Sequence, residues 1–426
     1  MWTGNSRVVC TFFFLLICFT GYGQAAKTPF SAFGLGEYFG NALTHNQGMG
    51  GVGVSAPDFW HLNNQNPALL VYNSLTVFEA GFIGEKRTAK GEGGIKEQSG
   101  SGNLNYLAMA FPVKRGKWSM GLGLMPYTNV NFRINSVAAI EGSTNTVNVT
   151  ETGSGGINQF YWSNGVVINA DWSVGVKTTY YFSSIINEFN TTLTDAPQLQ
   201  QISTNIFDRQ SFQGFGFSLG VSYHKDSLFS KKNYQLNLGA VYDFKANIDT
   251  EFFERFERRN IGGIIDSVTL INNIPGTTTL PPALSVGASL SKGFQWTIGA
   301  DFTLLDFTQF RDFGGNNFNA QRGWQLAFGG KITPDPRSVT SYLKRVTYRT
   351  GLSVAEMPFL VDGNAVKDFG INFGLSLPVS RVSSLDFAVK VGKRGDSQKN
   401  TLEENYFKLY FGMTFNDQWF VKRRFD

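Results

Sequence analysis

The sequence has only two cysteines, and both lie close to its N-terminus. Cys10 and Cys18 fall within an apolar run, 8–20, that follows Arg7 and precedes the small residues of 23–26. A basic residue, a short apolar run and a small-residue cleavage site are typical of a secretory signal peptide, and this run is too short to cross a bilayer as a helix. We therefore expect residues 1–24 to be removed. The exported chain then forms no disulfide bonds and no thiolate metal sites.

Charge and histidine are also scarce. Charged residues make up 16% of the sequence and the formal net charge is +5, which gives no reason to expect a nucleic-acid partner. His45, His61 and His224 are too scattered to form a recognisable metal site, and no Ser or Asp stands at a spacing that suggests a hydrolase. We expect no metal, no cofactor and no catalytic residue. His224 is expected near a turn, as a solvated residue.

Long apolar runs are missing as well. After residue 20 no run reaches about 18 residues, which excludes membrane-spanning helices but not membrane-spanning strands. Phenylalanine and glycine are abundant instead, with 40 and 48 residues. They occur in segments where apolar side chains alternate with small or polar ones, as Trp172, Val174 and Val176 alternate with Ser173 and Gly175. A period of two predicts strands with one apolar face.

This alternation predicts fourteen strands, and the weakest of them lies in a segment, 157–169, that could instead form a short helix. The predicted strands are 75–84, 103–112, 118–130, 157–163, 171–183, 212–224, 234–248, 283–291, 294–305, 323–332, 347–355, 369–378, 384–392 and 405–415.

Long and short spacers alternate between these strands, except at 333–346. Outer-membrane barrels have short periplasmic turns and long outer loops, whereas a soluble sandwich has no reason to place its long loops at one end. Trp172 and Tyr180 would stand about 26 Å apart along a strand, or roughly 20 Å across a membrane at a tilt near 40°, which suits two aromatic belts. We predict an all-β fold, a transmembrane antiparallel β-barrel of about 14 strands at 75–415, in contact with outer-membrane lipid and followed by a basic tail, 416–426.

Fourteen strands enclose a lumen that wall side chains alone do not fill. Residues 27–74 precede the strands and are rich in aromatic residues, glycine, asparagine and proline. A packed plug, or hatch, is favoured over a loose periplasmic tail because such aromatic residues need burial.

The hatch contains the pattern G-x-G-x-x-G at Gly48, Gly50 and Gly53, with Gly51 between them. A dinucleotide site places these glycines between a buried strand and a helix. Pro57 and the polar sequence after it prevent a long helix here, so the glycines are expected to let the backbone turn tightly and pack against the barrel wall.

The glycine-rich run, Asp58 and the tripeptide Asn66-Pro67-Ala68 just before the first strand resemble the N-terminal segment of the FadL family of outer-membrane transporters for hydrophobic compounds. The segments 280–302 and 348–378 and the C-terminal end are similar to a FadL-related branch found in bacteria with type IX secretion, related to PorV. The resemblance implies a fourteen-stranded barrel with a hatch inside it, and it assigns hatch and gating roles to Gly48, Gly50, Gly51, Gly53, Asn66, Pro67 and Ala68.

The two longest predicted loops, 184–211 and 249–282, face outward if the hatch begins in the periplasm. In the FadL family these two loops together form a hydrophobic site where ligands enter. Both carry apolar residues at helical spacing, so we expect amphipathic helices that either take up a ligand or only pack on each other. The residues concerned are Leu199, Ile202, Ile206, Phe252, Phe253 and Phe256.

These observations favour passive uptake of a hydrophobic small molecule, gated by the hatch. An apolar ligand needs a continuous apolar route, which only the hatch and the outer loops offer. The alternative is a barrel that works as a partner or adaptor in a surface or secretion complex, in the manner of PorV.

Overall fold

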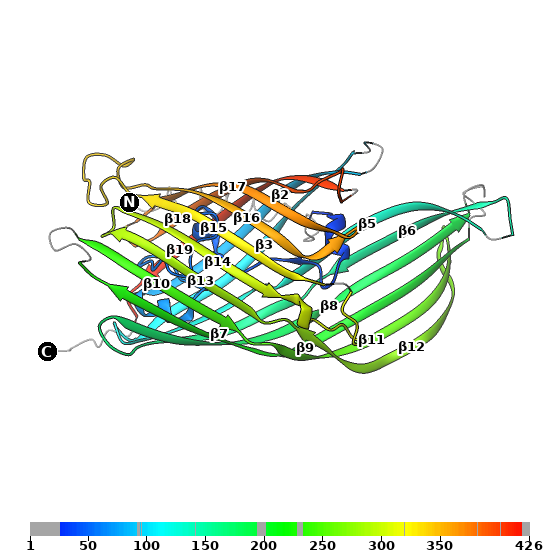
Figure 1. Cartoon of the computed structure of the whole chain (residues 1–426), viewed down its shortest axis with the longest axis horizontal. Coiled ribbons are helices and arrows are strands. Elements are labelled where there is room, and N and C mark those ends of the chain that lie inside the picture. Colours follow the sequence, from blue (N-terminus) through cyan, green and yellow to red (C-terminus); the bar gives the residue numbers. More distant parts are fainter. Residues whose placement is uncertain are drawn as a thin grey trace, which may run out of the picture.

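The structure, a computed structural model, describes residues 26–91, 94, 96–140, 142–193, 202–227, 233–318, 320–380, 382–400 and 402–419. The predicted signal peptide and most of the predicted tail lie outside these residues. Strands form a closed cylinder, and the N-terminal segment, residues 26–75, runs through its interior (Figure 1).

Fourteen antiparallel strands surround the lumen, and the last of them pairs with the first along its whole length, from Lys90 opposite Glu403 to Thr76 opposite Asp417. The prediction of a fourteen-stranded barrel is confirmed, including the weakest strand. In order around the wall, the strands are β2 (Thr76–Lys90), β3 (Lys96–Lys114), β4 (Trp118–Pro126), β7 (Asn158–Val167), β8 (Trp172–Leu193), β9 (Ser203–Lys225), β10 (Tyr234–Asp243), β13 (Ala283–Lys292), β14 (Trp296–Asp306), β15 (Arg322–Ile332), β16 (Thr347–Val361), β17 (Asn364–Pro378), β18 (Ser384–Gly395) and β19 (Glu403–Asp417).

Burial alternates along the wall as the sequence pattern requires. In β17, Phe369, Ile371 and Phe373 are exposed on the outside, whereas Asn372 and Ser376 are buried on the lumen side. An apolar outer face and a polar inner face are typical of barrels that span a membrane. The last strand runs on to Asp417, past its predicted end at Phe415. No helix among the described residues is long and apolar enough to span a membrane.

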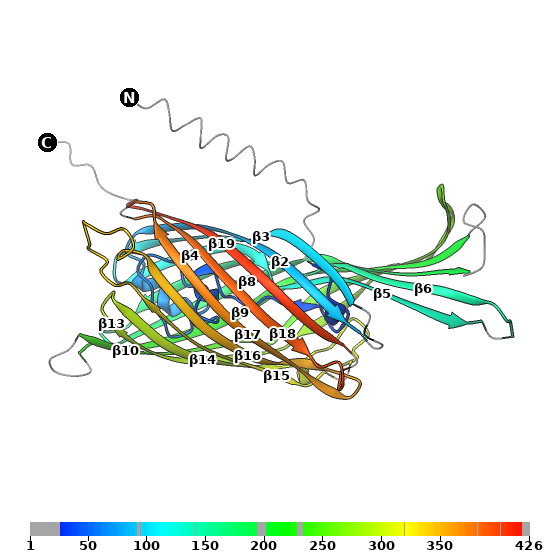
Figure 2. The same ribbon diagram turned by 90° about the horizontal axis from the view of Figure 1, so that it is seen from above.

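Six strands continue beyond one rim of the cylinder as a sheet, which we call the extension (Figure 2). Its order is β5 (Thr128–Ala139), β6 (Thr146–Gly155), the upper parts of β8 and β9, β11 (Ala246–Asn260) and β12 (Gly263–Leu280). The wall bends where the extension begins, at Gly155 and Gly156 with φ of 101° and 145° and at Ser183 with φ of 113°. The other end of the barrel carries the short connections 115–117, 168–171 and 293–295, and we call it the turn end. Because short turns face the periplasm in outer-membrane barrels, the extension lies on the extracellular side.

The prediction of helices in 184–211 and 249–282 is wrong for the parts of these ranges that the structure describes. Ile206 lies in β9, and Phe252, Phe253 and Phe256 lie in β11, which pairs with β9 on one side and β12 on the other. An apolar pattern this short fits a helix or a strand, and the free edge of β9 decides in favour of the strand because it satisfies the backbone hydrogen bonds of β11. Leu199 lies outside the described residues, and Ile202 immediately precedes β9.

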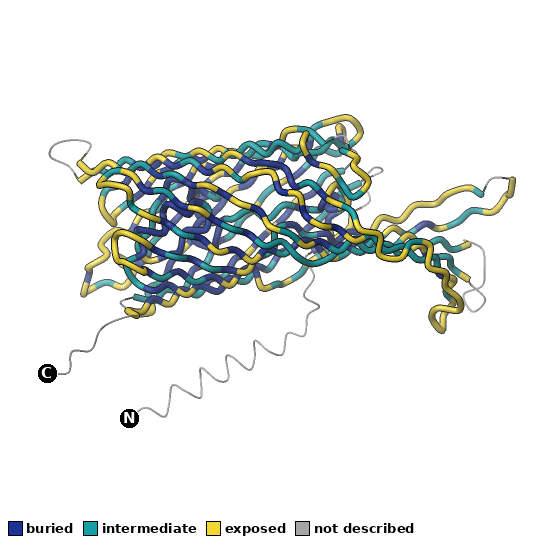
Figure 3. The backbone as a smooth tube through the Cα atoms, turned by 90° about the horizontal axis from the view of Figure 1, so that it is seen from below, coloured by how far each residue is buried: buried dark blue, intermediate teal, exposed yellow. Residues whose placement is uncertain are grey.

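The N-terminal segment has little regular structure. It contains η1 (Pro29–Ala32), β1 (Glu37–Tyr38), α2 (Thr44–Gln47) and η2 (Pro67–Tyr72), and a further short helix, η5 (Phe307–Gln309), follows β14. Burial is nonetheless concentrated within the barrel, and the extension is exposed over much of its length (Figure 3). The interior core is therefore made by the wall and the N-terminal segment together.

Candidate functional site

The N-terminal segment packs against the lumen wall along its whole path. Leu43, Leu62 and Leu70 are almost completely buried, and they form one apolar cluster with Tyr106 and Tyr161 of the wall. The segment therefore occupies the lumen at the level of the membrane-spanning strands.

The glycine-rich run binds a carboxylate of the wall. The backbone N–H groups of Gly53 and Val54 donate hydrogen bonds to one oxygen of Asp301 at 2.6 Å and 2.7 Å, and the Ser55 hydroxyl donates to the other oxygen at 3.3 Å. Successive N–H groups that converge on one anion are a common use of glycine-rich backbone. In this chain the anion is a side chain of the barrel, which explains a nucleotide-like motif without a nucleotide.

Glycines of the wall make room for this contact. Gly299, Gly329 and Gly351 are consecutive register partners on β14, β15 and β16. A Cβ atom on Gly329 or Gly351 would overlap the carbonyl group of Met49. Gly165, Gly175 and Gly239 on β7, β8 and β10 touch the backbone of the segment in the same way, and Gly220 on β9 touches the side chains of Asn66 and Pro67. The backbone of the N-terminal segment thus rests directly on the backbone of the wall.

Asn66 and Pro67 fix the last part of the segment. The Asn66 side chain accepts a hydrogen bond from Ala68 N at 3.0 Å, which caps η2, and its amide donates to Val54 O and Val221 O at 2.9 Å and 3.1 Å. A Cβ on Gly220 would lie 2.8 Å from Pro67. Asn66 therefore joins the glycine-rich run, the short helix and strand β9 at one point.

A buried cluster around His61 holds the segment near the turn end. His61 Nε2 lies 3.0 Å from Asp386 of β18, and its Nδ1 lies 3.2 Å from Asp58, which also pairs with Lys331 of β15 at 2.6 Å. Burial alone lowers the pKa of His61, but the two carboxylates outweigh it and raise the pKa to about 10. His61 is therefore a cation at neutral pH.

His45 is stacked on His61 with ring centroids 4.5 Å apart. Burial, and then the positive charge of His61, hold the pKa of His45 well below its usual range, so His45 is neutral. The described residues contain no group of three or more His, Cys, Asp or Glu side chains arranged to hold a metal ion.

A second buried network fastens the segment near the rim. Glu37 of β1 contacts Arg87, Arg394 and Lys408 of the wall at 2.6 Å, 2.9 Å and 3.3 Å. Burial raises the pKa of Glu37, but the three cations outweigh it and hold the pKa well below its usual range. The complete network also includes Glu85, Glu404, Asp368 and Lys390. Its four carboxylates balance its four cations only when Glu37 is in place.

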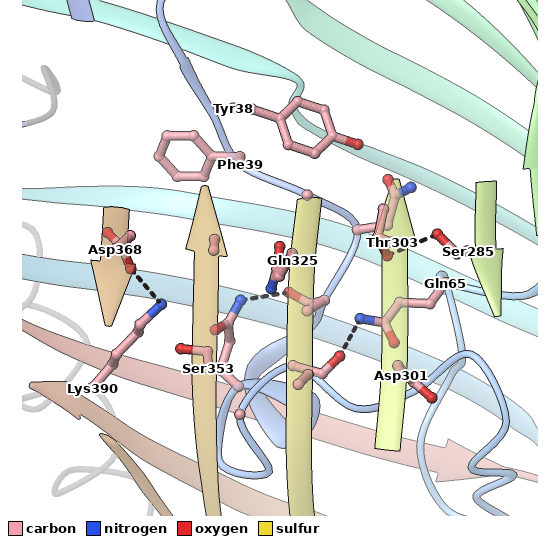
Figure 4. A pocket seen from close by; sticks show the side chains of 18 of the residues that line it. Tyr38, Phe39, Gln65, Ser285, Asp301, Thr303, Gln325, Ser353, Asp368 and Lys390 are labelled. Carbon is pink, nitrogen blue, oxygen red and sulfur yellow. Dashed lines mark hydrogen bonds and ion pairs between the residues drawn. The ribbon is translucent and has the colours of Figure 1, made fainter. Parts of the chain in front are cut away.

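A cavity of about 170 Å³ lies between the N-terminal segment and the barrel wall (Figure 4). Its lining includes Gln325, Ser353 and Thr303 of the wall, together with the ion pair of Lys390 and Asp368. Binding pockets for apolar ligands are larger, about 300–1,000 Å³, and mostly apolar. The cavity in this conformation therefore suits water and polar groups better than a hydrocarbon.

The start of the N-terminal segment covers a gap in the wall. Near the rim β4 continues as β5, which moves away from β3. Thr28 N donates to Asn131 O of β5 at 2.8 Å, and Tyr38 and Glu37 pair with Thr128 and Asn129. On the other side of the gap, Ser99 of β3 donates to Lys27 O at 2.9 Å. Residues 26–38 thus bridge β3 and β5.

Of the residues predicted for ligand entry, Ile206, Phe252, Phe253 and Phe256 lie in strands of the extension. Ile206 and Phe256 are register partners, flanked in the same row by Phe189 and Val268. Phe252 stacks on Phe313 with centroids 5.4 Å apart. These contacts bring 184–211 and 249–282 together, as the family resemblance implies, and whether a ligand enters there stays a prediction.

Sequence reasoning missed the wall side of the site. Asp301 and Asp386 are charged residues within predicted strands, and Arg87 and Arg394 lie just beyond the predicted ends of 75–84 and 384–392; all four are buried on the lumen side. A charged residue at a strand position that faces the lumen indicates that the wall has a binding partner inside the barrel. The partner residue on the N-terminal segment, such as Glu37, cannot be recognised from the sequence around it.

The comparisons with known proteins agree with this architecture. The sequence matches the BamG family over residues 6–426. This chain belongs to the BamG family. No curated protein is a significant match.

The fold is that of FadL-type outer-membrane barrels. The P. putida toluene transporter TodX is 14% identical, with a TM-score of 0.58 over 90% of this chain and 99% of that one. The monoaromatic hydrocarbon channel CymD is 16% identical, with a TM-score of 0.55 over 89% and 98%. The Ralstonia pickettii toluene transporter TbuX is 15% identical, with a TM-score of 0.52 over 90% and 99%. The predicted FadL-like barrel is confirmed, whereas the relation to PorV and type IX secretion stays a prediction.

Proposed function

We propose that this outer-membrane barrel works as a protein partner at the cell surface, with the plugged cylinder serving as a rigid base for the extension. The observation that carries this proposal is the combination of a fastened lumen with an exposed sheet. Buried ion pairs fix the N-terminal segment at both levels, whereas the extension exposes large apolar side chains such as Val137, Ile264 and Val268, at 67%, 55% and 55%. Exposed apolar side chains of this size, on a sheet that lies beyond the barrel, are typical of protein-binding surfaces.

The test removes most of the β11–β12 hairpin, replacing residues 249–277 with a short Gly-Ser turn. The wild-type protein, gently extracted from its own membranes, should migrate in native electrophoresis as a particle larger than one barrel, and the shortened variant as a single barrel. A control variant that shortens 333–346 at the turn end should keep the large particle. A wild-type protein that migrates as a single barrel contradicts the proposal.

A second candidate function is uptake of hydrophobic small molecules, with the N-terminal segment as the gate. It is favoured by the bridge that residues 26–38 form between β3 and β5, because displacement of this bridge would open the wall. The similar structures are toluene transporters and a monoaromatic hydrocarbon channel, so toluene is the probe of choice.

An engineered disulfide tests gating directly. A Cβ on Gly412 would lie 3.0 Å from Thr44 Cβ, so Thr44→Cys with Gly412→Cys forms a disulfide after a small backbone shift, and the exported chain is expected to carry no other cysteine. Cells with the reduced variant should take up toluene at the wild-type rate, and oxidation should abolish the uptake. Equal uptake in both states would exclude movement of the segment as the gate.

A further inference from the structure

The extension has two outer edge strands, β5 and β12, and β12 is protected against pairing with another chain. Edge strands are commonly protected by bulges, proline or charge, which prevent another chain from pairing with them. On β12 the register with β11 shifts at three places, Pro275 lies within the strand and has no N–H to offer, and Asp266 is held by Arg258 at 2.7 Å. This edge carries the usual protection.

The opposite edge, β5, has no bulge and no proline, and beyond Arg133 it has no charge. Its register with β6 is unbroken from Val130 to Ala139. Residues 134–140 read Ile-Asn-Ser-Val-Ala-Ala-Ile, without charge, proline or glycine. All residues of 133–139 are exposed, and within the described part of the chain no residue pairs with their outer side. An unpaired strand edge without charge, proline or a bulge is a template for a further strand.

The chain itself already uses the lower part of this edge. Thr28, Glu37 and Tyr38 pair with β5 up to Asn131, and the N-terminal segment then leaves the edge. The unpaired part begins immediately above this contact and continues the same row of backbone donors and acceptors. An added strand would therefore extend a pairing that the fold has started.

We propose that the edge of β5 at residues 132–139 binds an extended, uncharged segment of a partner protein, which adds to the extension as a further strand. The inference rests on the proposed function, because it names the surface through which the partner is held. Main-chain hydrogen bonds provide the affinity in such pairing, and side-chain pockets on alternate residues provide the specificity.

A second copy of this chain fits this edge poorly. Two copies in one membrane are related by a twofold axis along the membrane normal. The extension continues along the long axis of the barrel (Figures 1 and 2). A twofold axis along the membrane normal leaves the direction of strands that run along it unchanged. Two β5 edges could then pair only in parallel, the less stable arrangement per residue.

The test introduces the charge that other edges use for protection. Val137→Lys with Ala139→Lys should lower the yield of the native particle at least tenfold, whereas Val339→Lys with Leu343→Lys, at two exposed apolar positions of the 333–346 connection at the turn end, should leave it within twofold. Both variants should show wild-type heat-modifiable migration, which reports a folded barrel. In the wild-type particle, about half of the amides of 132–139 should exchange hydrogen at least tenfold more slowly than in the isolated barrel.

Three outcomes overturn the inference. Equal particle yields from the two lysine variants, or equal exchange of 132–139 in the particle and in the isolated barrel, would show that this edge is free in the complex. Slow exchange that appears in the isolated barrel as its concentration rises would identify a second copy as the occupant. A particle that survives the β5 lysines but not the removal of 249–277 refutes only this inference, whereas a wild-type protein without any particle refutes the proposed function.

Discussion

Removal of the Glu37 charge tests how the N-terminal segment is held. In Glu37→Gln the side chain keeps its size, but Arg87, Arg394 and Lys408 lose their shared carboxylate and the buried network acquires a net positive charge. Loss of one partner from a buried ion pair costs about 3–5 kcal/mol. Since about 1.4 kcal/mol corresponds to a factor of ten, the equilibrium constant for release of the segment should rise roughly 10²- to 10³-fold or more.

Hydrogen exchange of the buried amides of α2 measures this constant in detergent-solubilised protein. The matched control is Glu403→Gln, which breaks a pair with Lys393 at 2.9 Å whose lysine side chain is 51% exposed. Exposed pairs contribute at most about 1 kcal/mol, so exchange should accelerate less than roughly tenfold. Glu37→Gln combined with Lys408→Gln restores the charge balance and should recover part of the protection.

The pH dependence follows from the lowered pKa of Glu37. A carboxylate whose folded pKa is depressed contributes its stability above its ordinary pKa, and the contribution is lost only as the pH falls through the folded value. The difference between wild type and Glu37→Gln should therefore be constant around neutral pH and shrink in strong acid. Similar exchange rates for Glu37→Gln and Glu403→Gln at neutral pH would refute this account of the network.

Three further predictions concern the same segment. The folded pKa of His61 is raised to about 10, so the stability that His61 gives the segment is complete below about pH 6.5 and is lost as the pH rises towards 10. The equilibrium constant for release of α2, measured by hydrogen exchange and corrected for the intrinsic rate, should therefore increase over this range in wild type and stay flat in His61→Gln. Gly329→Val should expose the segment to protease, because the new side chain overlaps the Met49 carbonyl, whereas Gly102→Val, whose Cβ would have no neighbour closer than 3.9 Å, should not. Asp301→Ala leaves two buried N–H groups unpaired and should destabilise the segment by about 2–5 kcal/mol in urea titrations, clearly more than Asp301→Asn, which retains an acceptor; equal effects would contradict the hydrogen-bonding role.

Much of the architecture could be predicted because it depends on patterns among residues that are close in the sequence. Alternation such as that of Trp172, Val174 and Val176 is a property of neighbouring residues, and it defines both a strand and its apolar face. The Asn66-Pro67-Ala68 tripeptide combines a helix cap with a proline at the first helical position, so its local conformation is also encoded locally. The extension was missed because the apolar spacing around Phe252 and Phe256 is compatible with two conformations.

The sequence by itself determined that this protein is a fourteen-stranded barrel with an apolar outside and an N-terminal segment in need of burial, because the period of side chains and the turn residues act over a few positions. Only the tertiary structure decided which wall residues hold that segment. Asp301 meets Gly53, Asp386 meets His61 and Arg87 meets Glu37 across long stretches of chain, and no local pattern pairs them. It also decided that 249–282 is a hairpin, because a strand needs the edge of a neighbour to satisfy its backbone, and that neighbour comes from elsewhere in the chain.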